Sequence, residues 1–247
     1  MIRRLSLLLP VLATALLSSH VATAGQEVDT WEFHVFVAKA SLDSGDMLAK
    51  ERSLGGDVDG DGSASSGTFT RSSSLEDNAF AGFRLGYVWT PLFETELSYD
   101  RNHTGGNYQH IVTDNSSGQV ERVDGRIGSF ITTYQFGLLY HPLGGWQTHW
   151  QPYATVTGGW VDVDLAPSKT LETELSHSVA GGFYKIDFPQ GDHGLMFGYA
   201  GGCKYFIVPN VAARAEIRGK TYSVFGERRR DVEISIGMSF FVPGVYN

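Results

Sequence analysis

The chain of 247 residues contains a single cysteine, Cys203, so it cannot form an intramolecular disulfide. Beyond its first segment it has no run that approaches roughly 18 consecutive apolar residues, so we expect no membrane-spanning helix. Basic residues are scarce, with 19 Lys and Arg against 27 Asp and Glu, and this balance argues against a nucleic-acid partner. Stability must therefore come from packing and from closure of a sheet.

The first 24 residues have the pattern of a secretory signal peptide. Arg3 and Arg4 supply a positive start, residues 5–17 are mostly apolar, and Ala22-Thr23-Ala24 matches a small-residue cleavage site. The apolar run is shorter than the roughly 20 residues of a membrane-spanning helix. We expect residues 1–24 to be cleaved and residues 25–247 to form one domain.

The remainder alternates apolar and polar residues in segments of about ten, which is the period of a strand with one apolar face. The connections alternate in length, and the long polar ones, expected to be loops, are residues 41–76, 103–127 and 166–193. The eight expected strands are residues 30–40, 78–89, 93–102, 130–140, 151–165, 195–205, 211–220 and 232–242.

The sequence bears on the register of one strand pair and on the outward face of one further strand. If Trp89 and Phe93 share a face, the turn between them places Arg84 opposite Ser98 with Glu96 and Asp100 on the diagonals, and we expect a charge pair there. In the fifth segment the odd positions from Tyr153 and the even positions from Ala154 are both plausible outward sets. We favour the odd positions.

A water-soluble sandwich and a membrane barrel both need one apolar face per strand, but three features favour the barrel. Long and short connections alternate, as they do when one end faces the outside and the other the periplasm. Aromatic side chains gather near strand ends, where interfacial girdles form. The third feature is a charged opposite face, which in an eight-stranded barrel points into a bore that side chains fill. Its expected lumen charge network comprises Arg84, Glu94, Glu96, Asp100, Arg214, Glu216 and Glu233.

The stretch from Ala79 to Val242 resembles the small outer-membrane barrel family that includes the OmpA membrane domain and the OmpX-like and opacity-type proteins. The similar phrases are residues 81–87, 94–99, 151–154 and 201–216. The resemblance implies an all-β, eight-stranded, antiparallel up-and-down transmembrane barrel in the cell outer membrane. It also implies the lipid bilayer and lipopolysaccharide as partners.

The last strand resembles the barrel-assembly signal that the outer-membrane assembly machinery reads. The matching residues are Ser235, Gly237, Phe240 and Val242. Such signals usually end the chain, whereas here the sequence continues to Asn247. The resemblance implies the assembly machinery as a further partner.

Three candidate sites have simpler interpretations. The acidic loop from Asp57 to Asp61 has the spacing of a calcium loop, but its twelfth position is Thr68, so we expect a solvated loop without metal. Residues 176–178 read Ser-His-Ser in an expected loop, a weak basis for a lipid-modifying enzyme. Cys203 is expected to be a small residue of the wall.

These patterns predict a structural or surface-interaction barrel with no catalytic residues and no cofactor. Its lumen would be plugged by mixed charges, and its long loops would be available for binding. A narrow channel is the alternative, and a lipid-modifying enzyme is a weaker one.

Overall fold

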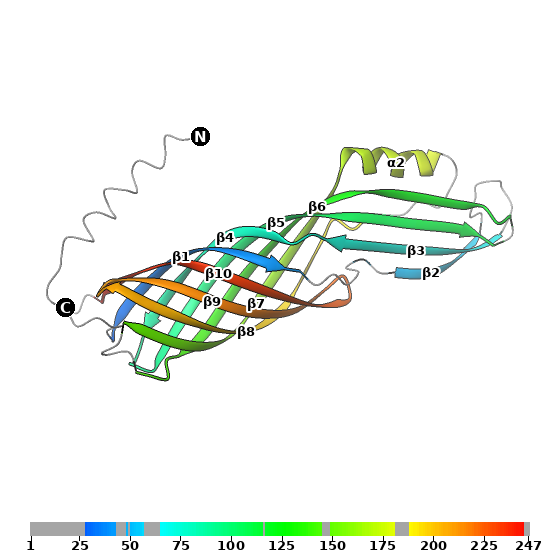
Figure 1. Cartoon of the computed structure of the whole chain (residues 1–247). Coiled ribbons are helices and arrows are strands. Elements are labelled where there is room, and N and C mark those ends of the chain that lie inside the picture. The colour runs from blue at the N-terminus through cyan, green and yellow to red at the C-terminus, as the bar shows by residue number, and fades with distance from the viewer. Residues whose placement is uncertain are drawn as a thin grey trace, which may run out of the picture.

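The structure is a computed structural model that describes residues 28–42, 48, 50–56, 65–115, 117–144, 149–180 and 188–244. The expected signal peptide, residues 1–24, lies outside the described residues, and its cleavage stays a prediction. Figure 1 shows a slanted barrel of long strands with a sheet and one helix extending beyond one end.

The barrel is a closed ring of eight antiparallel strands. β1 pairs with both β4 and β10, and β5 pairs with both β4 and β6, so the ring has no free edge. The expected eight-stranded antiparallel barrel is therefore confirmed. Its strands are β1 (Thr30–Ser41), β4 (Asn78–Val88), β5 (Phe93–Asp114), β6 (Val120–Tyr140), β7 (Trp150–Pro167), β8 (Gly191–Val208), β9 (Val211–Val224) and β10 (Glu227–Pro243).

The alternation of the sequence sets the two faces of the wall. In β1 every second residue is buried, from Thr30 to Ala40, and the residues between them are exposed. Because a strand has a period of two, the exposed residues form an outer wall and the buried ones fill the bore. Arg84 pairs with Ser98 in the β4–β5 ladder, which confirms that expected register.

The two ends of the barrel differ. β1 begins and β10 finishes at one end, where residues 89–92, 141–149 and 209–210 make short connections, and we call it the turn end. We call the opposite end, from which the additional sheet extends, the loop end (Figure 1). This arrangement is the usual one for outer-membrane barrels, whose short turns face the periplasm.

The expected long loops contain regular structure, so their assignment as irregular segments was wrong. Residues 41–76 include β2 (Lys50–Gly56) and β3 (Ser65–Leu75), and β5 and β6 continue through most of residues 103–127. β2, β3, β5 from Thr104 and β6 up to Ile127 form what we call the projecting sheet. The ladder persists because backbone pairing depends little on side-chain polarity, whereas glycine, serine and aspartate suggested a loop.

The third expected loop, residues 166–193, contains α2 (Lys169–Ala180), which packs mainly on β6. Leu171 is fully buried, and a Cβ on Gly125 would lie 2.7 Å from the Leu171 side chain, so only glycine permits this close approach. Among the residues that the structure describes, no helix is long and apolar enough to cross a membrane.

The connection of β9 to β10 is much shorter than residues 221–231, the gap between the seventh and eighth expected strands. β9 ends at Val224 and β10 begins at Glu227, with Phe225 and Gly226 at φ values of 54° and 82°. Two central residues with positive φ make a turn whose twist matches that of a hairpin. The strands therefore extend beyond the apolar wall at this hairpin.

The bore is filled in three layers. Phe206, Ala212 and Phe241 form a small apolar cluster toward the turn end. Charged side chains fill the middle of the barrel. A larger apolar cluster closes the loop end and continues under the projecting sheet; it includes Phe36, Phe80, Ile131, Val161, Leu165, Met196 and Leu171.

Candidate functional site

The outer wall of the barrel is a broad apolar surface. Its large exposed side chains come from all eight strands and reach 73% exposure at Leu195. Contiguous apolar surface on this scale is rare on water-soluble proteins. Members of this surface include Trp31, Phe33, Val35, Phe83, Leu97, Phe136, Val156, Phe197, Tyr199, Ile217, Ile234 and Ile236.

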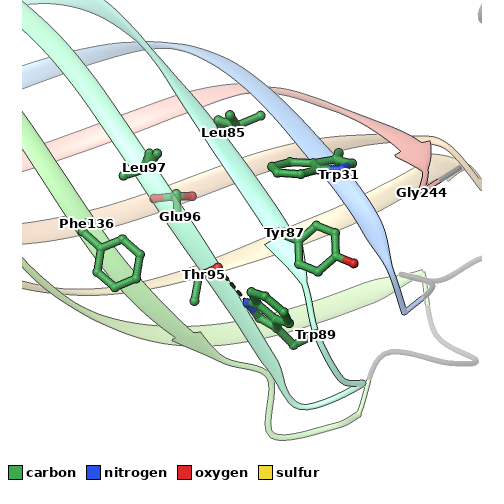
Figure 2. A pocket seen from close by; sticks show the side chains of 9 residues that line it. All are labelled: Trp31, Leu85, Tyr87, Trp89, Thr95, Glu96, Leu97, Phe136 and Gly244. Carbon is green, nitrogen blue, oxygen red and sulfur yellow. Dashed lines mark hydrogen bonds between the residues drawn. The ribbon is translucent and has the colours of Figure 1, made fainter. Parts of the chain in front are cut away.

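Aromatic residues at the turn end form an edge to this surface. Trp31 and Tyr87 pack edge to face with ring centroids 4.8 Å apart, and Tyr87 packs in the same way on Trp89 at 4.6 Å (Figure 2). Such amphipathic rings favour the boundary between lipid tails and water. A closed ring also leaves no unpaired strand edge in hydrocarbon. The chain is therefore a membrane-spanning β-barrel, and barrels of this kind lie in the outer membrane.

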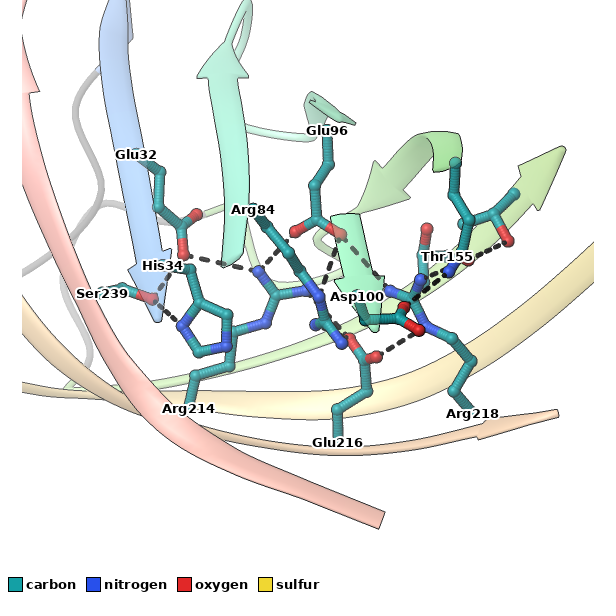
Figure 3. Close-up of polar contacts among 12 residues, drawn as sticks. Glu32, His34, Arg84, Glu96, Asp100, Thr155, Arg214, Glu216, Arg218 and Ser239 are labelled. Atoms are coloured by element: carbon teal, nitrogen blue, oxygen red, sulfur yellow. Dashed lines mark hydrogen bonds and ion pairs between the residues drawn. The ribbon is translucent and has the colours of Figure 1, made fainter. Parts of the chain in front are cut away.

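The middle layer of the bore is a network of ion pairs centred on Arg214. Its Nη1 lies 2.6 Å from Glu96 Oε2, and its Nη2 lies 2.8 Å from Glu216 Oε2. Arg84 reaches the same Glu216 oxygen at 3.0 Å, so two guanidinium groups share one carboxylate (Figure 3). These side chains are almost completely buried. Burial is tolerable here because the charges are paired and hydrogen-bonded.

Two further groups extend this network along the bore. Toward the turn end, Lys204 Nζ donates to Glu94 Oε2 at 2.7 Å and also pairs with Glu32. Toward the loop end, Lys220 Nζ donates to Asp100 Oδ2 at 3.1 Å and also pairs with Glu233. The seven residues singled out in the sequence thus all point into the bore and take part in ion pairs.

Four further members of the network were not expected from the sequence: Glu32, Lys204, Arg218 and Lys220. Arg218 Nε donates to Glu216 Oε1 at 2.8 Å, and Lys204 bridges two strands on the far wall. The signal in the sequence that could have identified these four residues is their position on the polar face of each strand. Alternation places a residue on a face, but it does not reveal which partner lies across a closed ring.

The favoured register of the fifth segment was wrong. In β7 the odd positions Tyr153, Thr155 and Val161 are buried, and the even position Trp160 is 60% exposed. The Tyr153 hydroxyl donates to Glu216 Oε2 at 2.7 Å and accepts from Arg214 Nε at 2.7 Å. This polar pairing inside the bore, together with the apolar layer nearer the loop end, explains why inward residues can be polar in one part of β7 and apolar in another.

The residues of the expected assembly signal lie on the seam where β10 meets β1. Gly237 pairs with Phe36 and Phe240 pairs with Phe33 in that ladder, while Ser235 is buried and Val242 is exposed. A Cβ on Gly237 would lie 2.1 Å from the Val35 carbonyl oxygen, so the seam itself requires glycine. Recognition by the assembly machinery stays a prediction.

The projecting sheet has one covered face and one polar face. Tyr108, His110 and Val123 point to the covered face, under α2 and the loop-end apolar cluster. Neighbouring rows present Ser72, Ser74, Asn107, Gln109, Asp124 and Arg126 on the polar face. This face includes a shallow groove of about 550 Å³.

Electrostatics differ between the two faces. Burial, followed by the nearby Arg71 charge, lowers the pKa of His110 from 6.5 to about 4. On the polar face, hydrogen bonds from Arg122 and Gln109 hold the pKa of Asp124 below its usual range. The covered face therefore favours a neutral imidazole, whereas the polar face favours an ionised carboxylate.

Most of the remaining sequence candidates lie outside the described residues. Asp57 to Asp61 lie outside the described residues, and the Ser-His-Ser segment lies in α2, whose side chains from residue 176 onward are outside them too. Within the described ranges, no three His, Cys, Asp or Glu side chains could hold a metal ion. Cys203 is half-buried in the wall.

A buried serine, histidine and glutamate do meet in the bore. Ser239 Oγ donates to Glu32 Oε1 at 2.5 Å and lies 3.0 Å from His34 Nδ1. Activation of a serine requires the histidine to lie between the serine and the acid. Here the serine is in the middle, so the geometry is that of a structural hydrogen-bond group.

No protein-family model matches the sequence, and no curated protein matches it. Comparison of folds gives several solved structures of outer-membrane proteins. OprG of Pseudomonas aeruginosa is 16% identical, with a TM-score of 0.48 over 90% of this chain and 99% of that one. Neisserial surface protein A is 14% identical, with a TM-score of 0.41 over 85% and 95%. Ail, the attachment invasion locus protein of Yersinia pestis, is 10% identical, with a TM-score of 0.42 over 87% and 100%.

The likeness to small outer-membrane barrels is thus one of fold. At these identities and scores it says nothing about activity, and the fold assignment depends on the strand pairing described above.

Proposed function

We propose that this chain is a structural and surface-interaction protein of the outer membrane, in which a closed barrel holds the projecting sheet above the membrane as a preformed binding surface. The observation that carries the proposal is the unbroken β5–β6 ladder, which runs from the pair Phe93–Tyr140 at the turn end to Thr113–Val120 beyond the loop end. A rigid ladder orders the exposed polar face before any ligand arrives, and this reduces the entropy lost on binding.

A plugged lumen is the second part of the proposal. The ion pairs from Lys204 to Lys220 and the apolar clusters on either side of them support it. Purified protein in a planar lipid bilayer should therefore show no stable conductance steps. Regular steps of uniform size would contradict the plug and favour the narrow channel.

Lipopolysaccharide is the proposed ligand of the outer surface near the membrane. Arg101 is exposed two residues beyond Tyr99, and its guanidinium carbon lies 4.5 Å from the centre of the Phe130 ring. His103 stacks on the same ring at 4.5 Å. An arginine held on an aromatic ring at headgroup level is suited to bind phosphate groups of a glycolipid.

This proposal is tested by binding of purified lipopolysaccharide to the detergent-solubilised chain. Arg101→Gln should weaken binding by roughly three- to tenfold, as expected for loss of one charge-assisted contact. The control is Lys169→Gln, which removes an exposed positive charge at the start of α2, away from this surface. Equal affinity in both variants would contradict the proposed site.

The proposal includes no catalytic activity. The support for this is the order of the Ser239, His34 and Glu32 group, which does not match that of a hydrolase. Turnover of a lipid substrate by the purified chain would overturn it.

A further inference from the structure

Two neighbouring hollows mark the outer wall at the turn end. The first has a volume of about 400 Å³ and lies between Trp89 and Phe136, with Thr95 and Leu97 at its base (Figure 2). The second, about 500 Å³, lies on the other side of Trp31 and is bordered by Val242. Trp31 and Leu85 line both, so they form a ridge between two apolar depressions.

The first hollow follows directly from the sequence of β5. Thr95 stands in the outward row between Tyr87 on β4 and Leu138 on β6, where its short side chain leaves space. Trp89 Nε1 donates to Thr95 Oγ1 at 2.8 Å, which fixes the indole ring at the turn end of the hollow. The depression is therefore bounded by a held aromatic ring.

The position of the hollows determines what can occupy them. Both open on the lipid-facing wall, beside the aromatic group of Trp31, Tyr87 and Trp89. In a membrane this surface meets lipid chains near their headgroups. Two apolar depressions separated by one ridge match the two acyl chains of a single diacyl lipid.

The mouth of the hollows carries a negative charge. Asp29 Oδ1 accepts a hydrogen bond from the Tyr87 hydroxyl at 3.2 Å, and the Asp29 carbonyl accepts one from Gly244 N at 2.7 Å. Tyr87 and Gly244 both line the first hollow, so this half-buried carboxylate lies beside it.

Charge complementarity then selects the headgroup. In the described part of the turn end, the other Asp, Glu, Lys and Arg side chains, such as Glu94 and Lys204, are buried in the bore. The group at the mouth thus favours a cation and disfavours an anionic lipid. The exposed faces of Trp31 and Trp89 would also attract an ammonium group.

We propose that these two hollows bind one diacyl phospholipid with an amine headgroup, of the phosphatidylethanolamine type, from the membrane leaflet at the turn end. The acyl chains lie on either side of the Trp31 and Leu85 ridge, and the ammonium group contacts the Asp29 carboxylate. This site is separate from the proposed surface function, which concerns the loop end.

Native mass spectrometry of the full chain in detergent tests the proposal. Dioleoyl phosphatidylethanolamine and dioleoyl phosphatidylglycerol, which share acyl chains, are added separately, and the fraction of protein that retains one lipid is measured. We expect the amine lipid to be retained about threefold more, the order of preference that a partly exposed charge pair provides. Equal retention of the two lipids by the unaltered chain would overturn the headgroup assignment.

Two variants separate the headgroup from the acyl chains. Asp29→Asn should reduce the ratio of the two lipids to about one while retention of lipid continues, because only the charge changes. Thr95→Trp fills the first hollow and should remove retention of both lipids. Its control is Ala154→Trp, an exposed wall position on β7 outside both hollows.

Folding of each variant is checked by the mobility of unheated samples on a gel. If Thr95→Trp does not fold, Asp29→Asn still tests the headgroup contact, since it leaves the wall unchanged, and a lipid ratio equal to that of the unaltered chain would overturn the proposal. Retention by Thr95→Trp equal to that of Ala154→Trp would overturn the acyl site. A second copy of the chain bound in place of lipid, and lost in Thr95→Trp, would identify the surface as a dimer interface instead.

Discussion

Arg214 on β9 and Glu96 on β5 face each other across the bore, with Arg214 Nη1 2.6 Å from Glu96 Oε2. β9 and β5 are not neighbours in the ring, so this contact joins distant parts of the wall. Glu96 also lies 3.3 Å from Arg218 and 3.7 Å from Arg84, which makes one carboxylate common to three guanidinium groups. Loss of its charge would leave the buried positive charges undercompensated.

We therefore expect Glu96→Gln to lower the free energy of unfolding by about 3–5 kcal/mol. The measurement is equilibrium unfolding by urea in detergent. Glu121→Gln, which changes a half-exposed carboxylate on the projecting sheet, is the control and should cost less than about 1 kcal/mol. Similar losses in both variants would show that the network contributes no more than a surface charge.

The seam between the first and last strands gives a second prediction. Gly237→Ala places a Cβ where the Val35 carbonyl oxygen lies 2.1 Å away, so the strands must separate. We expect a loss of about 1–3 kcal/mol and less of the folded, fast-migrating form on unheated gels. Gly201→Ala is the matched control, because a Cβ there meets no atom within 4 Å. A folded fraction of Gly237→Ala equal to that of the control would contradict steric closure of the seam.

His110 makes the projecting sheet sensitive to acid. Its folded-state pKa of about 4 lies below the ordinary value of 6.5, so the unfolded sheet binds the proton more readily. Its contribution to stability is complete above pH 6.5 and is lost as the pH falls from 6.5 to about 4. Hydrogen exchange of residues 104–127, corrected for intrinsic rates, should therefore accelerate at pH 4.5.

Two variants test this assignment. His110→Gln should reduce the pH dependence of exchange in the projecting sheet. His193→Gln, at an exposed position of β8 near the loop end, should leave it unchanged. An unchanged pH profile in His110→Gln would assign the acid sensitivity to another group.

Leu171 holds α2 against β6, where it packs over Gly125 and is fully buried. Leu171→Ala should weaken this attachment by about 2–5 kcal/mol, the usual cost of truncating a buried leucine. We expect trypsin to cut after Lys169, the one Lys or Arg in the sequence of α2, more than tenfold faster while the barrel stays intact. The neighbouring exposed Glu172→Ala is the control, and equal cleavage rates would show that α2 is held by other contacts.

The barrel could be predicted from the sequence because apolar and polar residues alternate along its strands with a period of two. Arg84 and Ser98 were paired correctly from the alternation of two adjacent strands and the length of their turn. The same reasoning failed for β7, where both faces carry apolar residues: Val161 and Val163 are buried, while Val156 and Trp160 are exposed. A layered bore, partly charged and partly apolar, removes the contrast on which register prediction depends.

The ion pairs across the bore could not be predicted from the sequence for a different reason. The pairing of Lys204 with Glu32 and Glu94 depends on the shear and closure of the ring, which no local pattern contains. The projecting sheet was missed because Gly105, Gly106, Gly125 and Gly128 resemble loop residues. In the structure two of them permit close approach, of β3 to Gly106 and of α2 to Gly125.

The continuous β5–β6 hairpin also has a mechanical consequence. A pull on its tip acts along both strands in the same direction, so the load passes to the β4–β5 and β6–β7 ladders that flank them in the wall. Hydrogen bonds in antiparallel ladders lie across the strands, and such a force shears many of them at once instead of opening them one by one. The barrel would therefore resist a pulling force on a bound ligand, because many hydrogen bonds would have to break together.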